Sequence, residues 1–389
     1  MVESLEYGVP TTEEDLQFLK AVEMQCFLGT PEMGDRYFQQ IGIDNFRLVR
    51  RGTTRIGGLS ILNMGQWFGG RQVTTAGIAS VGIAPEHRGT GAALGMMERV
   101  IQESYERGSA LSTLYPAAQR LYRRAGYEQG GEQCGWEVDP AMIRLAEHDL
   151  PIRAIAPERE TLEPIYTQVA QHHNGNLDRH TSIWQQILFA TADEPVYAYL
   201  VGTTPQGYIV FRQKSTSGEA HLAIADWAAL TAAAGRCLWS FLASHRSQID
   251  KIRWRGSPVD GMIFLLPEQT ATLRYTERWL VRIVNAALAL TSRGYPPHLE
   301  ADLHLHLTDP LLPANNGPLI LSVAHGQGEV KPGGRGELSL DITGLATLYT
   351  GLFTPWHLQR LGQVEGTAGA IATATALFAG PTPWMPDFF

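Results

Sequence analysis

The sequence VGIAPEHRGTGAAL, residues 81–94, carries the most specific pattern in this chain, because it joins a predicted β-strand to a predicted α-helix. Gly89 and Gly91 let the backbone turn so that several N–H groups point inward. The helix that begins near Ala92 adds the positive end of its dipole, and Arg88 adds a fixed positive charge. Together these groups predict a site for a pyrophosphate, whereas a lone Gly-x-Gly would indicate only a turn.

Pro85 ends the strand before this loop and is expected to splay it from its neighbour. The backbone groups of Val81 and Ile83 are then free to pair with an extended amide ligand, such as a pantetheine arm. The sequence matches neither the Gly-Lys-Ser/Thr phosphate loop nor a Gly-x-Gly-x-x-Gly turn in a parallel βαβ unit. We therefore predict an acyl-coenzyme A site formed by Val81, Gly82, Ile83, Arg88, Gly89, Thr90, Gly91, Ala92 and Ala93.

Residues 1–150 form the first predicted unit, in which an antiparallel β-meander precedes the loop. The expected elements are a helix at 15–27, strands at 46–50, 55–63 and 72–81, a helix at 91–107, a strand at 110–114 and a helix at 116–124. Pro140 and Pro151 mark the first candidate boundary.

Residues 151–285 repeat this plan, which predicts a diverged duplicate of the first unit. The expected elements are a helix at 161–172, strands at 196–203, 207–212 and 220–227, and a helix at 232–245. Where the loop should be, Asp226 and Trp227 precede the helix and the paired glycines are missing. We expect this unit to bind no pyrophosphate and to shape a substrate cleft against the first unit.

Residues 286–389 form a third predicted unit of mixed α and β structure. The expected elements are strands at 301–308, 318–323, 328–330 and 337–341 and helices at 342–353 and 355–361. The last six residues, WMPDFF, are rich in aromatic side chains, which favours a tail that docks on the protein.

Composition and charge narrow the function. The chain has 389 residues, of which 44% are hydrophobic, as is typical of a globular protein with two or three domains. A net charge of −8 without a dense Lys/Arg run argues against a nucleic-acid partner and favours a cationic substrate. The Cys and His spacings predict no metal site. The sequence contains neither a secretory leader pattern nor a membrane-spanning segment, so we expect a cytoplasmic protein.

Arg88, Gly91 and Ala93 match the Arg/Gln-x-x-Gly-x-Gly/Ala signature, and the chain here resembles the GCN5-related N-acetyltransferase (GNAT) superfamily. The whole chain is more closely similar to the enhanced-intracellular-survival (Eis) family within it. Residues 279–285 and the Arg293-Gly294-Tyr295 step support this resemblance. It implies an α+β fold of two tandem GNAT-like domains, each a central mixed β-sheet flanked by helices, followed by a sterol-carrier-like domain. It also implies acetyl-coenzyme A as co-substrate.

Acetyl transfer needs a group that deprotonates the amine and a group that protonates the departing thiolate. Residues 121–127, LYRRAGY, offer Tyr122 as the proton donor, with Tyr127 and Tyr115 as alternatives. In the family that this chain resembles, the tyrosine at the position of Tyr122 is the general acid, and the C-terminal carboxylate enters the active site as the base. The resemblance thus implies that the α-carboxylate of Phe389 is the base.

Asp35 and Asp387 are candidate substrate-binding residues, because a carboxylate can hold a cationic amine. The resemblance implies an aminoglycoside-like, polyamine or lysine-type acceptor and a homo-oligomer, with a hexamer as one form. The alternative is a non-catalytic protein that binds acyl-coenzyme A or a lipid through its sterol-carrier-like domain. Intact Arg88, Gly91 and Tyr122 argue against that alternative.

Overall fold

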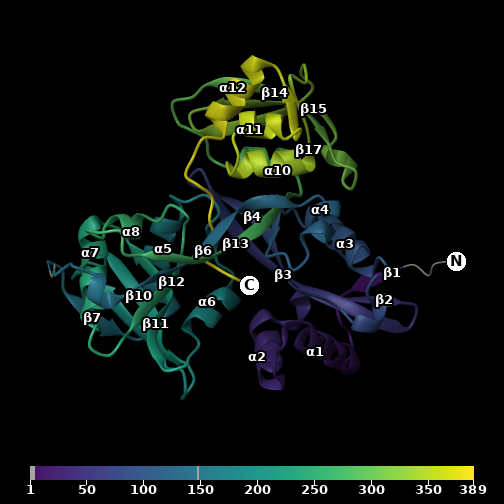
Figure 1. Ribbon diagram of the computed structural model, residues 1–389. Helices are drawn as coiled ribbons and strands as arrows, with labels where there is room; N and C mark the ends of the chain where they lie inside the picture. Colours follow the sequence, from purple (N-terminus) through teal and green to yellow (C-terminus); the bar gives the residue numbers. More distant parts are fainter. Residues whose placement is uncertain (1–4, 147–148) are drawn as a thin grey trace.

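The computed structural model describes residues 5–146 and 149–389. Within these residues the strands form one sheet of 13 strands and a separate sheet of five (Figure 1). In the described part of the chain, no helix is both long enough and apolar enough to cross a membrane.

The first unit has the predicted β-meander followed by helix, strand and helix. Its elements are β1 (Leu5–Gly8), α1 (Glu13–Phe27), α2 (Pro31–Ile41), β2 (Phe46–Arg51), β3 (Thr54–Phe68), β4 (Arg71–Ile83), α3 (Ala92–Glu106), β5 (Leu111–Leu114), α4 (Gln119–Arg124) and β6 (Glu128–Val138). A capping box starts α1, because the Thr12 side chain accepts from the backbone of Asp15 while the Asp15 side chain accepts from the backbone of Thr12. The expected elements are confirmed, and α2 and β6 are additional.

The second unit repeats this plan, as predicted. It consists of β7 (Ile152–Ile155), α5 (Arg159–Ala170), β8 (Leu177–Asp178), α6 (Thr181–Leu188), β9 (Tyr197–Val201), β10 (Gly207–Thr216), β11 (Glu219–Ala229), α7 (Ala232–Ala243), β12 (Lys251–Gly256), α8 (Gly261–Phe264) and β13 (Thr272–Ile283). Its strands β11 and β12 pair in parallel, as β4 and β5 do in the first unit.

The first two units share one continuous sheet. Its strand order is β1-β2-β3-β4-β5-β13-β6-β12-β11-β10-β9-β7, so β13 lies between β5 and β6 of the first unit. The second half of β13, from Trp279 to Ile283, is buried there. The sequence pattern does not predict this position of β13, because the hydrophobic pattern of a buried strand is the same whichever strands it pairs with.

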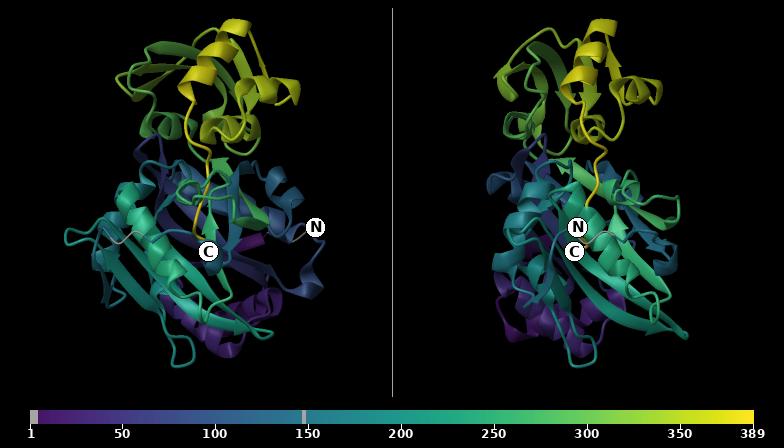
Figure 2. Two further views of the ribbon diagram at one scale, coloured as in Figure 1. Left: turned by 60° about the vertical axis from the view of Figure 1, so that its left-hand side comes forward. Right: turned by 90° about the vertical axis from the view of Figure 1, so that its left-hand side faces the viewer.

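The third unit stands apart on its own sheet, with the strand order β16-β15-β14-β17-β18. Its elements are α9 (Ala286–Ser292), β14 (Ala301–Thr308), β15 (Gly317–Ala324), β16 (Gln327–Pro332), β17 (Leu338–Asp341), α10 (Ile342–Thr350), α11 (Pro355–Arg360), β18 (Val364–Gly366) and α12 (Ala368–Leu377). Helix α10 packs against β6 and β13 of the large sheet. After α12 the chain leaves this unit and runs down into the other two (Figure 2). Two α+β units on one shared sheet, followed by a third α+β unit on its own sheet, match the predicted fold class.

Candidate active site

Strands β4 and β5 pair over a short distance and then part. Thr75 to Gly77 pair with Leu111 to Thr113, and the rest of β4 pairs with β3 alone. A register shift on β4 lies at Ser80, which has a φ of 51°. This bulge bends the strand locally. The divergence therefore begins before Ser80, well ahead of Pro85, which was expected to contribute to it and which follows the end of β4. Val81, Gly82 and Ile83 lie on the part of β4 that β5 leaves uncovered.

The loop after β4 has open backbone at its two glycines. Gly89 and Gly91 have φ values of 75° and 82°, and an added Cβ at either would meet no heavy atom within 4 Å. The guanidinium of Arg88 is fixed at the base of the loop, because its Nε donates to the carbonyl oxygen of Ile83 at 3.1 Å. The Thr90 hydroxyl donates to the carbonyl oxygen of His87 at 2.7 Å.

Helix α3 begins at Ala92 without a side-chain cap. The first N–H groups of a helix need an external partner, and an anionic ligand is one such partner. Ala92 is buried and Ala93 packs on the same core, so the helix end is held firmly behind the loop. These features fit the phosphates of acetyl-coenzyme A.

The second unit differs at the equivalent place. Strands β11 and β12 also part after a short parallel pairing, and a cavity of about 360 Å³ lies there. However, the Thr231 side chain caps α7 by accepting from the backbone N–H of Ala234. The Trp227 ring lies across this region, with its centroid 5.2 Å from Trp239 and 5.8 Å from Trp254. One N–H of the helix end is thus already paired and the paired glycines are missing, which supports the prediction that this unit binds no pyrophosphate.

Tyr122 lies on α4 inside the core of the first unit and is 4% exposed. Burial raises the pKa of its phenol to about 12. The two alternative tyrosines have hydroxyl partners within the chain: Tyr127 with Ser112 at 2.7 Å, and Tyr115 with Gln133 at 3.2 Å. Among the described residues, no hydrogen-bond partner is found for the Tyr122 hydroxyl, so that hydroxyl is the one available to a ligand.

The tail is bound along the first two units by its backbone. The Gln133 side chain donates to the carbonyl oxygens of Met385 and Pro386 at 3.1 and 3.0 Å. The Phe389 ring packs on Gly77, where an added Cβ would lie 2.9 Å from the ring. Gly77 is the last β4 residue paired with β5, so the tail ends where the two strands part. The prediction that the tail docks is confirmed.

A buried ion-pair cluster holds the tail two residues before Phe389. Arg179 donates to the Asp387 carboxylate at 3.0 Å and to both oxygens of Asp226 at 2.6 and 3.0 Å. The side chain of Arg179 is 0% exposed and stacks on the ring of Tyr166 at 3.6 Å. Burial raises the pKa of Asp387, and the charge of Arg179 partly opposes that rise. Sequence reasoning missed Arg179, because its partners lie 47 and 208 residues away.

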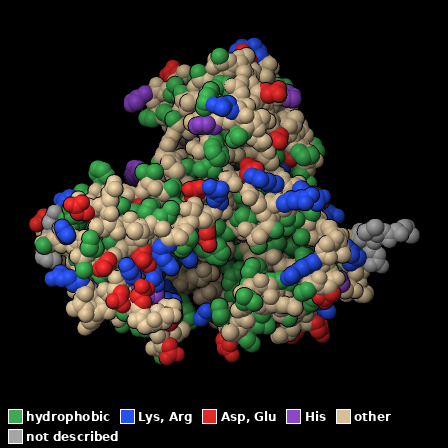
Figure 3. Space-filling view, in the orientation of Figure 1, with side chains coloured by type: hydrophobic (Ala, Val, Ile, Leu, Met, Phe, Trp, Pro, Cys, Tyr) green, Lys and Arg blue, Asp and Glu red, His purple; other side chains and the backbone are tan. Residues whose placement is uncertain are grey.

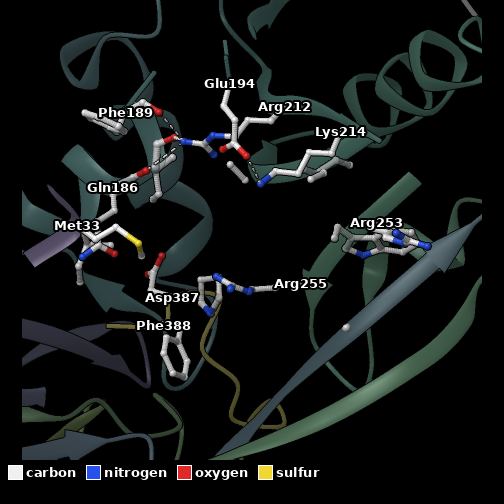
Figure 4. Close-up of a pocket in the computed structure, with 18 of the residues that line it drawn as sticks. Met33, Gln186, Phe189, Glu194, Arg212, Lys214, Arg253, Arg255, Asp387 and Phe388 are labelled. Carbon is white, nitrogen blue, oxygen red and sulfur yellow. Dashed lines mark hydrogen bonds and ion pairs between the residues drawn. The ribbon is translucent and has the colours of Figure 1, made fainter. Parts of the chain in front are cut away.

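A cavity of about 850 Å³ opens beside the tail, between α1–α2, α6 and strands β10 to β13 (Figures 3 and 4). Asp387 and Phe388 line it. The charge of Asp387 is already paired with Arg179, so this carboxylate holds the tail. Asp35 lies outside the lining residues and is exposed, with its carboxylate 2.6 Å from Lys20. Among the described residues, no group of His, Cys, Asp and Glu is arranged to hold a metal ion.

Three family models match consecutive parts of the chain. Two are described as acetyltransferase (GNAT) domains and match residues 9–130 and 175–283. The third is described as a sterol carrier protein domain and matches residues 286–386. Together with the loop and the parted strands, they define an acetyl-coenzyme A-dependent N-acetyltransferase.

Similar proteins cover nearly the whole chain. The structure of a GCN5-related N-acetyltransferase from Anabaena variabilis is 47% identical, covers 99% of this chain and 100% of its own, and has a TM-score of 0.97. One from Kribbella flavida is 28% identical, covers 100% and 99%, and has a TM-score of 0.88. N-acetyltransferase Eis of Mycobacterium tuberculosis is 26% identical over 87% of this chain and 88% of its own. The chain belongs to the GCN5-related N-acetyltransferases, and the resemblance to Eis predicted from the sequence is confirmed.

Proposed function

We propose that this enzyme acetylates an amine that enters the large cavity, using acetyl-coenzyme A bound along the parted strands β4 and β5. The observation that carries the proposal is the position of the tail. Phe388 lines the cavity, while the next residue, Phe389, packs on Gly77 where the strands part. The end of the tail thus lies between the space for the amine and the groove for the thioester.

The proposed reaction is a direct transfer. The α-carboxylate of Phe389 accepts a proton from the amine, whose nitrogen attacks the thioester carbon. The C–S bond then breaks, the acetyl group stays on nitrogen, and the sulfur takes a proton from the Tyr122 hydroxyl. An α-carboxylate has a pKa of about 3.5 in water and is a weak base there. A pKa raised by loss of solvent when the substrates bind, or a water relay, would make it effective.

The environment of Tyr122 supports its role as the acid. A phenol with a pKa of about 12 keeps its proton at neutral pH. Burial disfavours a thiolate in the same way as a phenolate, so the apolar core that raises the pKa of Tyr122 also raises that of a sulfur bound beside it. The two groups therefore remain close enough in basicity for the proton to move as the C–S bond breaks.

We propose a lysine-type, polyamine or aminoglycoside-like amine as the acceptor. Glu23 lines the cavity and, among the described residues, has no ion-pair partner, which supports a contact with a protonated amine. The test is release of free thiol from acetyl-coenzyme A in the presence of each amine class. Thiol release that depends on an amine supports the proposal. If acetyl-coenzyme A binds but none of these amines causes release, the proposed acceptor classes are wrong and the proposal fails.

We also propose that the enzyme is a homo-oligomer, with a hexamer as the expected form, because the Eis-like arrangement covers the whole chain. Analytical ultracentrifugation at micromolar concentration tests this. A stable monomer would contradict it.

A further inference from the structure

The large cavity is rich in positive charge, although the whole chain carries a net charge of −8. Its basic lining residues are Arg36, Arg212, Lys214, Arg253, Arg255 and Arg274, and its acidic ones are Glu23, Glu194 and Asp387. The close-up of the cavity shows several of these basic side chains arranged around the same space (Figure 4). A cavity for a purely cationic acceptor would be expected to have more acidic than basic lining residues, whereas this one has more basic ones.

Most of these cations already have a role within the protein. Lys214 pairs with Glu194 at 3.0 Å. Arg253 pairs with Glu137 at 2.6 Å, and Arg274 lies 3.5 Å from the same carboxylate.

Two further basic residues stabilise the cavity wall. Arg212 donates to the carbonyl oxygens of Gln186, Ile187 and Phe189 at the end of α6. The guanidinium of Arg36 lies 4.2 Å from the centre of the Phe189 ring.

Arg255 differs from the other basic lining residues in its contacts. It lies on β12 two residues after Arg253, so both side chains project from the same face of the strand into the cavity. Its side chain is exposed, and Figure 4 shows it beside Asp387 and Phe388. Among the described residues, no hydrogen bond, ion pair or ring contact is found for its guanidinium. The Asp387 carboxylate pairs with Arg179 and forms no ion pair with Arg255 within 4.0 Å, although the charge of Arg255 partly opposes the rise in the pKa of Asp387.

We propose that Arg255 binds an anionic group on the acceptor, so that the substrate is an amine that also carries a carboxylate or a phosphate. The planar guanidinium can hold two oxygens of either group at once. Arg255 lies close to the end of the tail, so the anion would be bound near the reacting nitrogen and orient it. This inference rests on the proposed function, and it separates lysine-type acceptors from polyamines and aminoglycosides, which lack such a group.

The experiment compares matched acceptors. Lysine is paired with cadaverine, which is lysine without its carboxylate, and phosphoethanolamine is paired with ethanolamine. We expect the wild type to have the higher kcat/KM for at least one anionic member. In Arg255→Gln, kcat/KM for that member should fall roughly 10- to 100-fold, as a charge-assisted hydrogen bond is lost, while kcat/KM for the partner that lacks the anionic group changes little. The pair that responds shows whether the group is a carboxylate or a phosphate.

Arg274→Gln is the matched control, because it removes one charge from the same cavity without removing Arg255. It should change both members of a pair by a similar factor. The proposal is overturned if Arg255→Gln changes both members equally, or if the wild type favours neither anionic amine. Calorimetric binding of lysine and phosphoethanolamine, measured without acetyl-coenzyme A, keeps the two proposals distinguishable. Binding lost in Arg255→Gln supports the anion site even if no turnover occurs, and equal binding in both proteins contradicts it.

Discussion

Replacing Arg179 by Met removes the cation that joins the tail to the second unit. The Asp387 and Asp226 carboxylates would then both remain buried without their counter-charge, because each pairs with Arg179. Removing one partner of a buried pair costs about 3–5 kcal/mol. If that whole cost acts on tail docking, the equilibrium constant for docking falls about 10²- to 4 × 10³-fold, since about 1.4 kcal/mol corresponds to a factor of ten.

The assay is steady-state acetyl transfer, with acetyl-coenzyme A affinity and the thermal midpoint measured on the same protein. We expect Arg179→Met to lower kcat by up to about 4 × 10³-fold. Acetyl-coenzyme A affinity should be nearly unchanged, because Arg88 and Gly91 lie in the first unit. A general loss of folding would instead lower both.

A second variant tests the electrostatic cause. In Arg179→Met with Asp387→Asn, the buried charge of the tail is gone, and the tail should dock again through its backbone contacts with Gln133. The part of the lost rate that comes from the charge of Asp387 should return, while Asp226 still lacks its partner. The reasoning is refuted if Arg179→Met transfers acetyl groups at the wild-type rate, or if the double variant is no better than the single one.

Three further predictions concern the proposed acid, the acetyl-coenzyme A loop and a buried ion pair. Tyr122→Phe should lower kcat about 10²- to 10⁴-fold without weakening acetyl-coenzyme A binding. Because the pKa of Tyr122 is about 12, the wild-type kcat should not fall through loss of its proton up to about pH 10. A fall in kcat near pH 8 would indicate that another group is the acid. Calorimetry should find one acetyl-coenzyme A site per chain, abolished by Arg88→Glu with Gly91→Trp; a second site would show that α7 also binds phosphate. Arg282→Met removes the guanidinium that lies 2.8 Å from the buried Asp309 carboxylate. The free energy of unfolding, measured by denaturant titration, should fall by about 3–5 kcal/mol. An unchanged denaturation midpoint would contradict this prediction.

The sequence predicts the parts of this protein that depend on local pattern. The order of strands and helices in the first unit follows from hydrophobic periodicity, and the loop follows from Gly89, Gly91 and Arg88 within a few residues of one another. The bulge on β4 was not predicted, because Ser80 adopts a positive φ that a serine rarely has and that its identity does not reveal.

Other features depend on contacts between distant segments. The burial of β13 reflects hydrophobic residues that would suit several sheets, so its place between β5 and β6 is not encoded locally. The pairing of Arg179 with Asp226 and Asp387 joins three separate segments, and each residue alone resembles an ordinary surface charge. The positive charge of the cavity could not be predicted either, because its basic residues come from separate segments of a chain whose net charge is −8.

The most direct test of the proposed mechanism is a single-turnover measurement on protein extended by a few glycines after Phe389. The extension moves the α-carboxylate off Phe389, whose ring packs on Gly77, and alters no side chain. We predict that the extended protein binds acetyl-coenzyme A with wild-type affinity but transfers the acetyl group about 10²- to 10⁴-fold more slowly. Transfer at the wild-type rate would contradict the assignment of the Phe389 carboxylate as the base.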